Sequence, residues 1–252
     1  MEMRGWMGGL YRISEWIMRL SVTNVLWILV SLPFFFLLWM AVAATGAGVQ
    51  GAAGADAAAQ AAAGMLVFAL LSMPLFFFPG TAAMFSVVRK WVMGEEDVPI
   101  VRTFFRAYRE NFRMSALGGL VFVAASYVLY IDYQFYVVQS KSVFGVLFLA
   151  FIVLFSAALF NFFSLLSHLH LTFWQLLKNT ALITIGAPLH SLSVAISNGA
   201  LIWISFRFTF LIPFFVGSLM ALNSFYQFYR LFNKMKEKQE KWKNEKEESS
   251  SS

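Results

Sequence analysis

The side chains best suited to acid–base or metal chemistry in this chain are its 3 His, two of which form an H-x-H pair, His168 and His170. Residues two apart share a face of a strand, but on a helix they diverge by about 200°, two steps of about 100°. His190 lies beyond a further apolar stretch, so no third ligand is close in the sequence. The spacing therefore does not favour a metal site, and we expect no metal and no other cofactor.

Motifs of the common hydrolases and phosphate-binding enzymes give no support for catalysis. The chain contains no G-x-S-x-G, no P-loop and no H-E-x-x-H. With no Cys, it has no disulfide, no thiolate metal site and no cysteine nucleophile. We therefore expect that the chain is not an enzyme.

The strongest polar candidates within the long apolar stretches are three asparagines, Asn161, Asn198 and Asn223. Proton relays and ion-coupled transporters normally place an ionisable side chain inside the membrane, and these stretches carry almost none. Asparagines in such positions either hydrogen-bond neighbouring helices or line a solute cavity. From the sequence, both interpretations stay open.

A stripe of four arginines lies between the second and third long apolar stretches, at Arg102, Arg106, Arg109 and Arg113. Intervals of four, three and four place them on one side of a helix, about 99–113, that follows a turn at Gly94. Apolar side chains recur at helical spacing beside them: Val101, Phe104, Phe105, Tyr108 and Phe112. This amphipathic helix either lies on anionic lipid at the cytoplasmic surface or binds an acidic cytoplasmic partner.

The elements that must position these side chains are transmembrane helices. The 252-residue chain is 60% hydrophobic and only 13% charged, with a mean hydropathy of +0.69; soluble proteins carry about 25% charged residues. A membrane span needs about 20 mostly apolar residues. This window predicts an all-α, polytopic bundle of six spans at about 21–43, 65–88, 115–138, 143–167, 182–206 and 208–228.

The last two predicted spans are separated by Arg207 alone, so 182–228 is either a tight hairpin or one interrupted element. We prefer the hairpin. Short amphipathic segments ending at an Asn precede the first, third and fifth spans, which suggests three helical hairpins, each with an interfacial helix. Residues 1–232 then form one transmembrane domain, and 233–252 form a charged cytoplasmic tail rich in Lys and Glu.

The distribution of basic residues predicts the orientation. Of the 19 Lys and Arg, all but Lys141 and Arg207 fall in segments on the same side of the six-span arrangement. Basic residues collect in cytoplasmic loops, so both termini are expected in the cytoplasm. The accumulation of basic residues in cytoplasmic loops also accounts for the net charge of +6. No nucleic-acid-binding motif is present, so we expect no nucleic-acid partner.

Several segments of the chain resemble the YesL-like family of bacterial membrane proteins, a family of unknown function. The resemblance is carried by Phe78-Pro79-Gly80-Thr81-Ala82-Ala83, by Gly94 in Gly94-Glu95-Glu96-Asp97-Val98-Pro99, and by Asn111 in 103–112. Asn24-Val25-Leu26-Trp27 and Ser31-Leu32-Pro33 also look like the family's first span. The motif residues carried over are Pro79, Gly80, Thr81, Gly94 and Asn111.

The resemblance implies a multi-pass protein of the bacterial plasma membrane with a role connected to sugar uptake, because members are often encoded beside ABC-type carbohydrate importers. It supplies no catalytic residues. The first hypothesis is an accessory subunit that contacts a component of such a transporter through its arginine helix. The alternative is a small-solute permease or channel lined by Asn161, Asn198 and Asn223.

Overall fold

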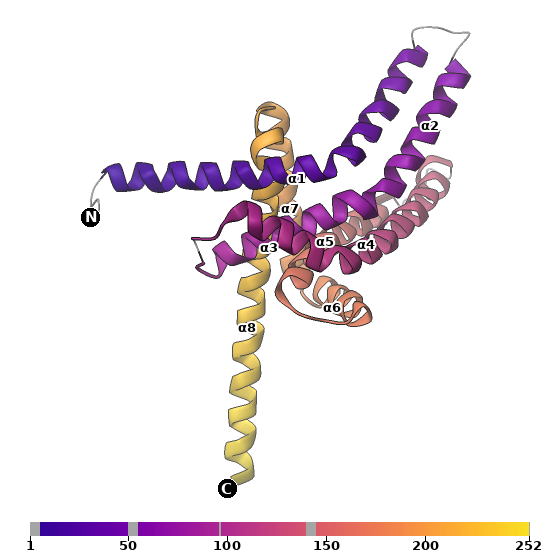
Figure 1. Cartoon of the computed structure of the whole chain (residues 1–252). Coiled ribbons are helices and arrows are strands. Elements are labelled where there is room, and N and C mark those ends of the chain that lie inside the picture. Colours follow the sequence, from indigo (N-terminus) through magenta and orange to yellow (C-terminus); the bar gives the residue numbers. More distant parts are fainter. Residues whose placement is uncertain (1–5, 50–54, 96, 140–144, 252) are drawn as a thin grey trace.

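The computed structural model describes residues 6–49, 55–95, 97–139 and 145–251, and all regular elements in these ranges are helices (Figure 1). The all-α class predicted from the sequence is confirmed. The α-helices are α1 (Trp6–Val49), α2 (Ala55–Ser72), α3 (Phe78–Val92), α4 (Ile100–Tyr133), α5 (Gly145–His168), α6 (Phe173–Gly186), α7 (Pro188–Arg207) and α8 (Gly217–Ser251). Short π-helical segments are η1 (Met73–Phe77), η2 (Gln134–Gln139) and η3 (Ile212–Val216).

Five helical stretches within the described residues are long and apolar enough to cross a membrane. They are Tyr11–Thr45, Asp56–Val92, Ile100–Tyr136, Phe148–His168 and Pro188–Arg207, and they overlap the first five predicted spans. The sixth predicted span, 208–228, lies in η3 and the start of α8 and is not among the five. The count of six spans and their arrangement as three hairpins therefore stay predictions.

The predicted fifth span, 182–206, has a break in the structure. Helix α6 ends at Gly186, Ala187 adopts φ −124° and ψ 67°, and α7 begins at Pro188. Proline disfavours the helical conformation of the residue before it and suits the first position of a helix. The predicted span therefore contains a helix break, and the long apolar helix of the structure begins at Pro188 rather than at 182.

The predicted amphipathic helix, 99–113, and the predicted third span, 115–138, form one continuous helix rather than two elements. Helix α4 runs from Ile100 to Tyr133 and passes directly into η2. Neither Gly nor Pro stands between Arg113 and Ser115, so nothing interrupts the backbone hydrogen bonds at the expected junction. The arginine stripe is thus carried rigidly by the same helix that enters the apolar bundle.

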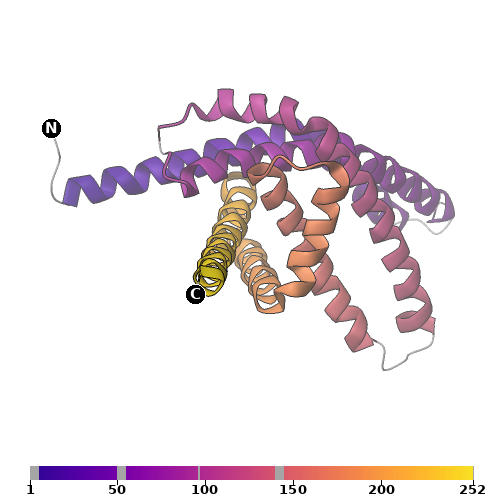
Figure 2. The same cartoon turned by 90° about the horizontal axis from the view of Figure 1, so that it is seen from below.

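Helix α3 lies at the centre of the molecule and contacts α1, α4, α5 and α8. Its Phe78 and Phe85 are buried against Phe163 of α5, with ring centroids 5.2 and 5.5 Å apart. A Cβ at Gly119 of α4 would lie 2.7 Å from Cα of Pro74, so the absence of a side chain allows α4 to approach η1 closely. Figure 1 shows the start of α1 and the end of α8 reaching away from this centre, and Figure 2 shows the start of α1 doing so from a second direction.

Candidate functional site

One face of α1 joins the first helix to two distant parts of the chain. Asn24, Trp27 and Ser31 recur at helical spacing and are buried. The indole Nε1 of Trp27 donates to Oγ1 of Thr81 in α3 at 3.0 Å. A Cβ at Gly80 would lie 2.9 Å from Cγ2 of Val30, so this glycine permits the close approach of α3 to α1.

Asn24 satisfies backbone groups at the start of the last long helix. Its Nδ2 donates to the carbonyls of Ile212 at 3.1 Å and Pro213 at 2.8 Å, and its Oδ1 accepts the N–H of Ser218 at 3.0 Å. Because η3 has π-helical hydrogen bonding and Pro213 has no N–H, the regular ladder is disturbed there. The buried amide therefore stabilises the junction between η3 and α8.

The motif residues carried over from the resemblance lie at packing and turn positions. Pro79 is in the first turn of α3, beside Gly80 and Thr81, and all three are buried. Asn111 of α4 donates from Nδ2 to Oγ of Ser86 in α3 at 3.3 Å. The motif residues of α3 and α4 thus connect α3 to α1 and to α4.

Gly94 ends α3 in the left-handed conformation, with φ +89°. The N–H of Gly94 bonds the carbonyl of Trp91 at 3.1 Å, and the N–H of Glu95 bonds the carbonyl of Lys90 at 2.9 Å, which together form a Schellman cap. Nζ of Lys90 also lies 2.7 Å from Oε2 of Glu95. Hydrogen bonding and attraction from Lys90 lower the pKa of the Glu95 carboxyl.

The arginine face of α4, defined as Arg102, Arg106, Arg109 and Arg113, is exposed along its whole length. The opposite side of the helix, with Thr103, Phe104 and Ala107, is buried. Arg106 lies 3.9 Å from Glu110, but both side chains are more than half exposed, so the pair contributes little to stability. No other member of the face has an ion pair with a described residue, which leaves three guanidinium groups available to an external anion.

The aromatic residues predicted to share one face of this helix are divided by the structure. Phe104 is fully buried in the bundle, whereas Val101 and Phe105 are exposed beside the arginines. Tyr108 and Phe112 are half-buried and contact each other, with ring centroids 5.9 Å apart. The segment is therefore anchored to the protein on one side while its outer side carries both apolar and cationic groups.

The three candidate asparagines fall into two separate hydrogen-bonded clusters. In the first, Nδ2 of Asn161 donates to Oγ1 of Thr184 at 3.1 Å, and Oδ1 of Asn161 lies 3.1 Å from Nε2 of His190. This cluster joins α5, α6 and α7. His190 and Thr184 were not identified from the sequence, because only the fold brings them to Asn161.

The second cluster lies between α7 and α8. Nδ2 of Asn198 donates to Oγ of Ser224 at 2.7 Å, and Nδ2 of Asn223 donates to Oδ1 of Asn198 at 2.9 Å. Nδ2 of Asn223 and Nε2 of Gln227 also reach Oγ of Ser197, at 2.7 and 3.0 Å. The four-residue interval between Asn223 and Gln227 was the sequence signal for this polar face, and it was missed.

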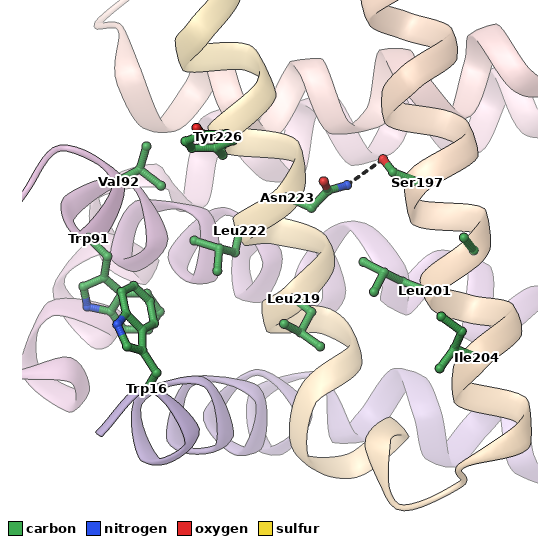
Figure 3. Close-up of a pocket in the computed structure, with 11 residues that line it drawn as sticks. Trp16, Trp91, Val92, Ser197, Leu201, Ile204, Leu219, Leu222, Asn223 and Tyr226 are labelled. Carbon is green, nitrogen blue, oxygen red and sulfur yellow. Dashed lines mark hydrogen bonds between the residues drawn. The ribbon is translucent and has the colours of Figure 1, made fainter. Parts of the chain in front are cut away.

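A cavity of about 700 Å³ opens beside the second cluster, between α1, α3, α7 and α8 (Figure 3). Its lining is mostly apolar or aromatic, with Trp16 and Trp91 near one end, and Asn223 turns toward Ser197. Asn161 and Asn198 do not line it. Of the three asparagines, only Asn223 therefore lines this cavity.

The two neighbouring histidines lie in different environments, although they do not share a helix, because α5 ends at His168. His168, the last residue of α5, is surrounded by rings of α8, the nearest being Phe232 at 4.8 Å between centroids. His170 follows the helix and is exposed. The structure thus places one ring in helix packing and leaves the other at the surface.

Comparison with known proteins agrees with the motif evidence. The model of the family "Protein of unknown function, DUF624" matches residues 20–133, which include α2, η1, α3 and the whole of α4. Uncharacterized protein YesL of Bacillus subtilis (strain 168) is 30% identical over 215 residues, 85% of each chain. Uncharacterized protein YteU of the same organism is 29% identical over 224 residues, 88% of this chain and 84% of the relative.

A third relative, uncharacterized protein YesV of Bacillus subtilis (strain 168), is 30% identical over 167 residues, 62% of this chain and 77% of the relative. No solved structure matches the chain. The resemblance to YesL-like proteins is confirmed, and the chain belongs to the DUF624 family of proteins of unknown function.

Proposed function

We propose that this protein crosses the bacterial plasma membrane six times with both termini in the cytoplasm. Five apolar helical stretches support the membrane location, and the first part of α8 supplies the sixth crossing. The polar side chains of α8 within that part bond to α7, which reduces the cost of placing them in lipid. In this orientation the arginine face of α4 and the charged end of α8 share the cytoplasmic side.

The function that we propose is that of an accessory membrane subunit linked to an ABC-type carbohydrate importer. The observation that supports it is the exposed arginine face of α4, in which Arg102, Arg109 and Arg113 have no ion pair with a described residue. Guanidinium groups bind carboxylates in a bidentate manner, which suits an acidic surface on a transporter domain or its ATPase. Because α4 continues into the bundle, a partner bound there is held at a defined distance from the membrane.

The polar groups of the bundle favour this role over the alternative of a permease or channel. Asn161 and Asn198 are buried and bonded to side chains of neighbouring helices, so their hydrogen-bonding groups serve the packing of the bundle. Uptake of radiolabelled sugars into vesicles containing the purified protein alone tests the alternative. Solute flux above that of empty vesicles would favour the permease over the accessory subunit.

The accessory role is tested by affinity purification of the full chain from its native membrane. We expect an ABC importer component among the co-purified proteins, and its recovery to fall when all four arginines of the face are replaced by Gln. The matched control replaces Lys236, Lys238, Lys241 and Lys243, which are exposed on α8, by Gln. Absence of any importer component, or equal losses in both variants, would count against the proposal.

A further inference from the structure

A small polar cavity of about 230 Å³ lies between α3, the first half of α4 and the end of α5. It is separate from the asparagine clusters and from the larger apolar cavity beside α7. Its polar lining includes Arg89 and Lys90 of α3, Arg106 and Asn111 of α4, and His170 after α5. Helices α3 and α4 thus bring three basic side chains, Arg89, Lys90 and Arg106, to one hollow beside the end of α5.

The charges around this cavity do not cancel. Lys90 is held by Glu95 at 2.7 Å, and Arg106 lies 3.9 Å from Glu110, which also lines the cavity. Arg89 has no carboxylate within 4.0 Å among the described residues, and its Nε is buried without a hydrogen-bond partner there. The cavity therefore carries one uncompensated positive charge and a buried donor that needs an acceptor.

Thr103 and Asn111 supply further hydrogen-bond donors, whereas the hydroxyls of Ser86 and Ser167 already donate to the carbonyls of Ala82 and Ser164 at 2.8 and 3.0 Å. Oγ of Ser86 and Nδ2 of Asn111 lie 3.3 Å from each other at the wall, and the hydroxyls of Thr103 and Ser167 are also part of the lining. Arginine combined with hydroxyl and amide donors is the usual protein environment of a phosphate group.

We propose that this cavity binds a single phosphate group, either the phosphodiester of an anionic phospholipid or a free phosphate. The volume is smaller than the roughly 300–1,000 Å³ of pockets that enclose whole drug-sized ligands, which fits a phosphate better than an entire sugar or nucleotide. The single uncompensated charge matches the single charge of a diester. The proposal stands independently of any transporter partner, because it concerns only the interior of this chain.

Two binding measurements on the purified full chain distinguish the sources. Native mass spectrometry after incubation with phosphatidylglycerol or with zwitterionic phosphatidylcholine reports a bound lipid. Isothermal titration with inorganic phosphate reports the free anion. Selective retention of phosphatidylglycerol alone identifies the lipid diester, and phosphate binding identifies the free anion; either supports the site, and failure of both overturns it.

Substitutions at the cavity test whether the phosphate group binds there. We expect Arg89→Gln to weaken it about tenfold or more, since it removes a charge-assisted hydrogen bond. His170→Glu places a carboxylate at the exposed rim of the cavity without changing the buried core, so it should also weaken binding of the phosphate group. His170→Gln adds no negative charge and should leave the binding unchanged. Lys178→Gln, an exposed change on α6, controls for net charge. If Arg89→Gln does not fold, the result for His170→Glu decides: binding as tight as that of the wild-type protein would overturn the proposal.

Discussion

Asn24 and Pro213 are 189 positions apart, yet Nδ2 of Asn24 donates to the carbonyl of Pro213 at 2.8 Å. The same amide accepts the N–H of Ser218, so one side chain of α1 serves both sides of the junction between η3 and α8. A helix near the start of the chain therefore helps to hold the last long helix in place.

Replacement of Asn24 by Ala should lower the thermal stability of the purified protein. The change removes three buried hydrogen bonds, to the carbonyls of Ile212 and Pro213 and from the N–H of Ser218, and a buried group left unsatisfied costs about 1–3 kcal/mol. Thermal unfolding in detergent, followed by circular dichroism, measures the effect. Val25→Ala, an exposed change one residue away, is the control, and equal midpoints for the two variants would contradict the role of Asn24.

Gly80→Ala should destabilise the contact between α1 and α3. The new methyl group would lie 2.9 Å from Cγ2 of Val30 and 3.0 Å from Oγ of Ser31, and overpacking of this kind costs about 1–3 kcal/mol. The same substitution at Gly199 of α7 meets nothing within 4 Å. There it should be neutral or raise stability by about 0.5–1 kcal/mol, because Ala is the better helix former.

Thermal unfolding of the two glycine variants under one detergent condition checks this pair of predictions. The comparison separates crowding from helix propensity, since both changes add one methyl group to a helical position. A loss of stability at Gly199 as large as that at Gly80 would show that crowding against Val30 is not the cause.

The contribution of the Lys90–Glu95 contact should depend on pH. The pKa of Glu95 is lowered in the folded protein from its ordinary value of 4.5, chiefly by the hydrogen bond from Lys90. A lowered folded-state pKa stabilises the fold above pH 4.5, and the effect is lost as the pH falls through the folded-state value. We expect Glu95→Gln to unfold at a lower temperature than wild type at pH 7, and the difference to vanish in acid.

The difference at pH 7 should be small, because more than half of the Glu95 side chain is exposed and solvent screens the carboxylate. Unfolding midpoints of both proteins from pH 7 down to pH 3 test the sign. Glu110→Gln provides a comparison with a more distant pair on α4. A gap between wild type and Glu95→Gln that widens in acid would contradict the assigned direction.

Hydropathy and helical spacing predicted the helical class and the positions of five apolar stretches, because both signals are local. The turn at Gly94 and the exposed arginine face also follow from short-range chemistry. Hydropathy does not show the break at Pro188, since apolar residues continue on both sides of it. The proline itself is the local signal of that break.

The side-chain clusters could not be predicted, because they depend on which helices become neighbours. Asn161 meets His190 across 29 positions, and Asn24 meets Ser218 across 194. No period in the sequence encodes these contacts. The basic cavity beside Arg89 could not be predicted for the same reason. The sequence identified Arg106 as part of the arginine face, but only the packing of the helices places Arg106 beside α3 and the end of α5.

The six-span arrangement makes a prediction about the two sides of α8. The chain has no Cys, so a single introduced cysteine can be labelled without background. In right-side-out membranes, a membrane-impermeant maleimide should label Thr209→Cys, at the turn between α7 and η3, but not Lys238→Cys in the charged end of α8. Permeabilised membranes should allow labelling of both, and unmodified chain should give no signal.

These two positions are informative because both are exposed in the folded chain, so a lack of labelling reports the membrane rather than burial. They also lie on either side of the predicted sixth span, 208–228. Labelling of one position from each side requires the chain to cross between them, as the accumulation of basic residues in the end of α8 leads us to expect. Labelling of both from the same side would mean that α7 and α8 enter and leave the bilayer on one face, and the count of six spans would be wrong.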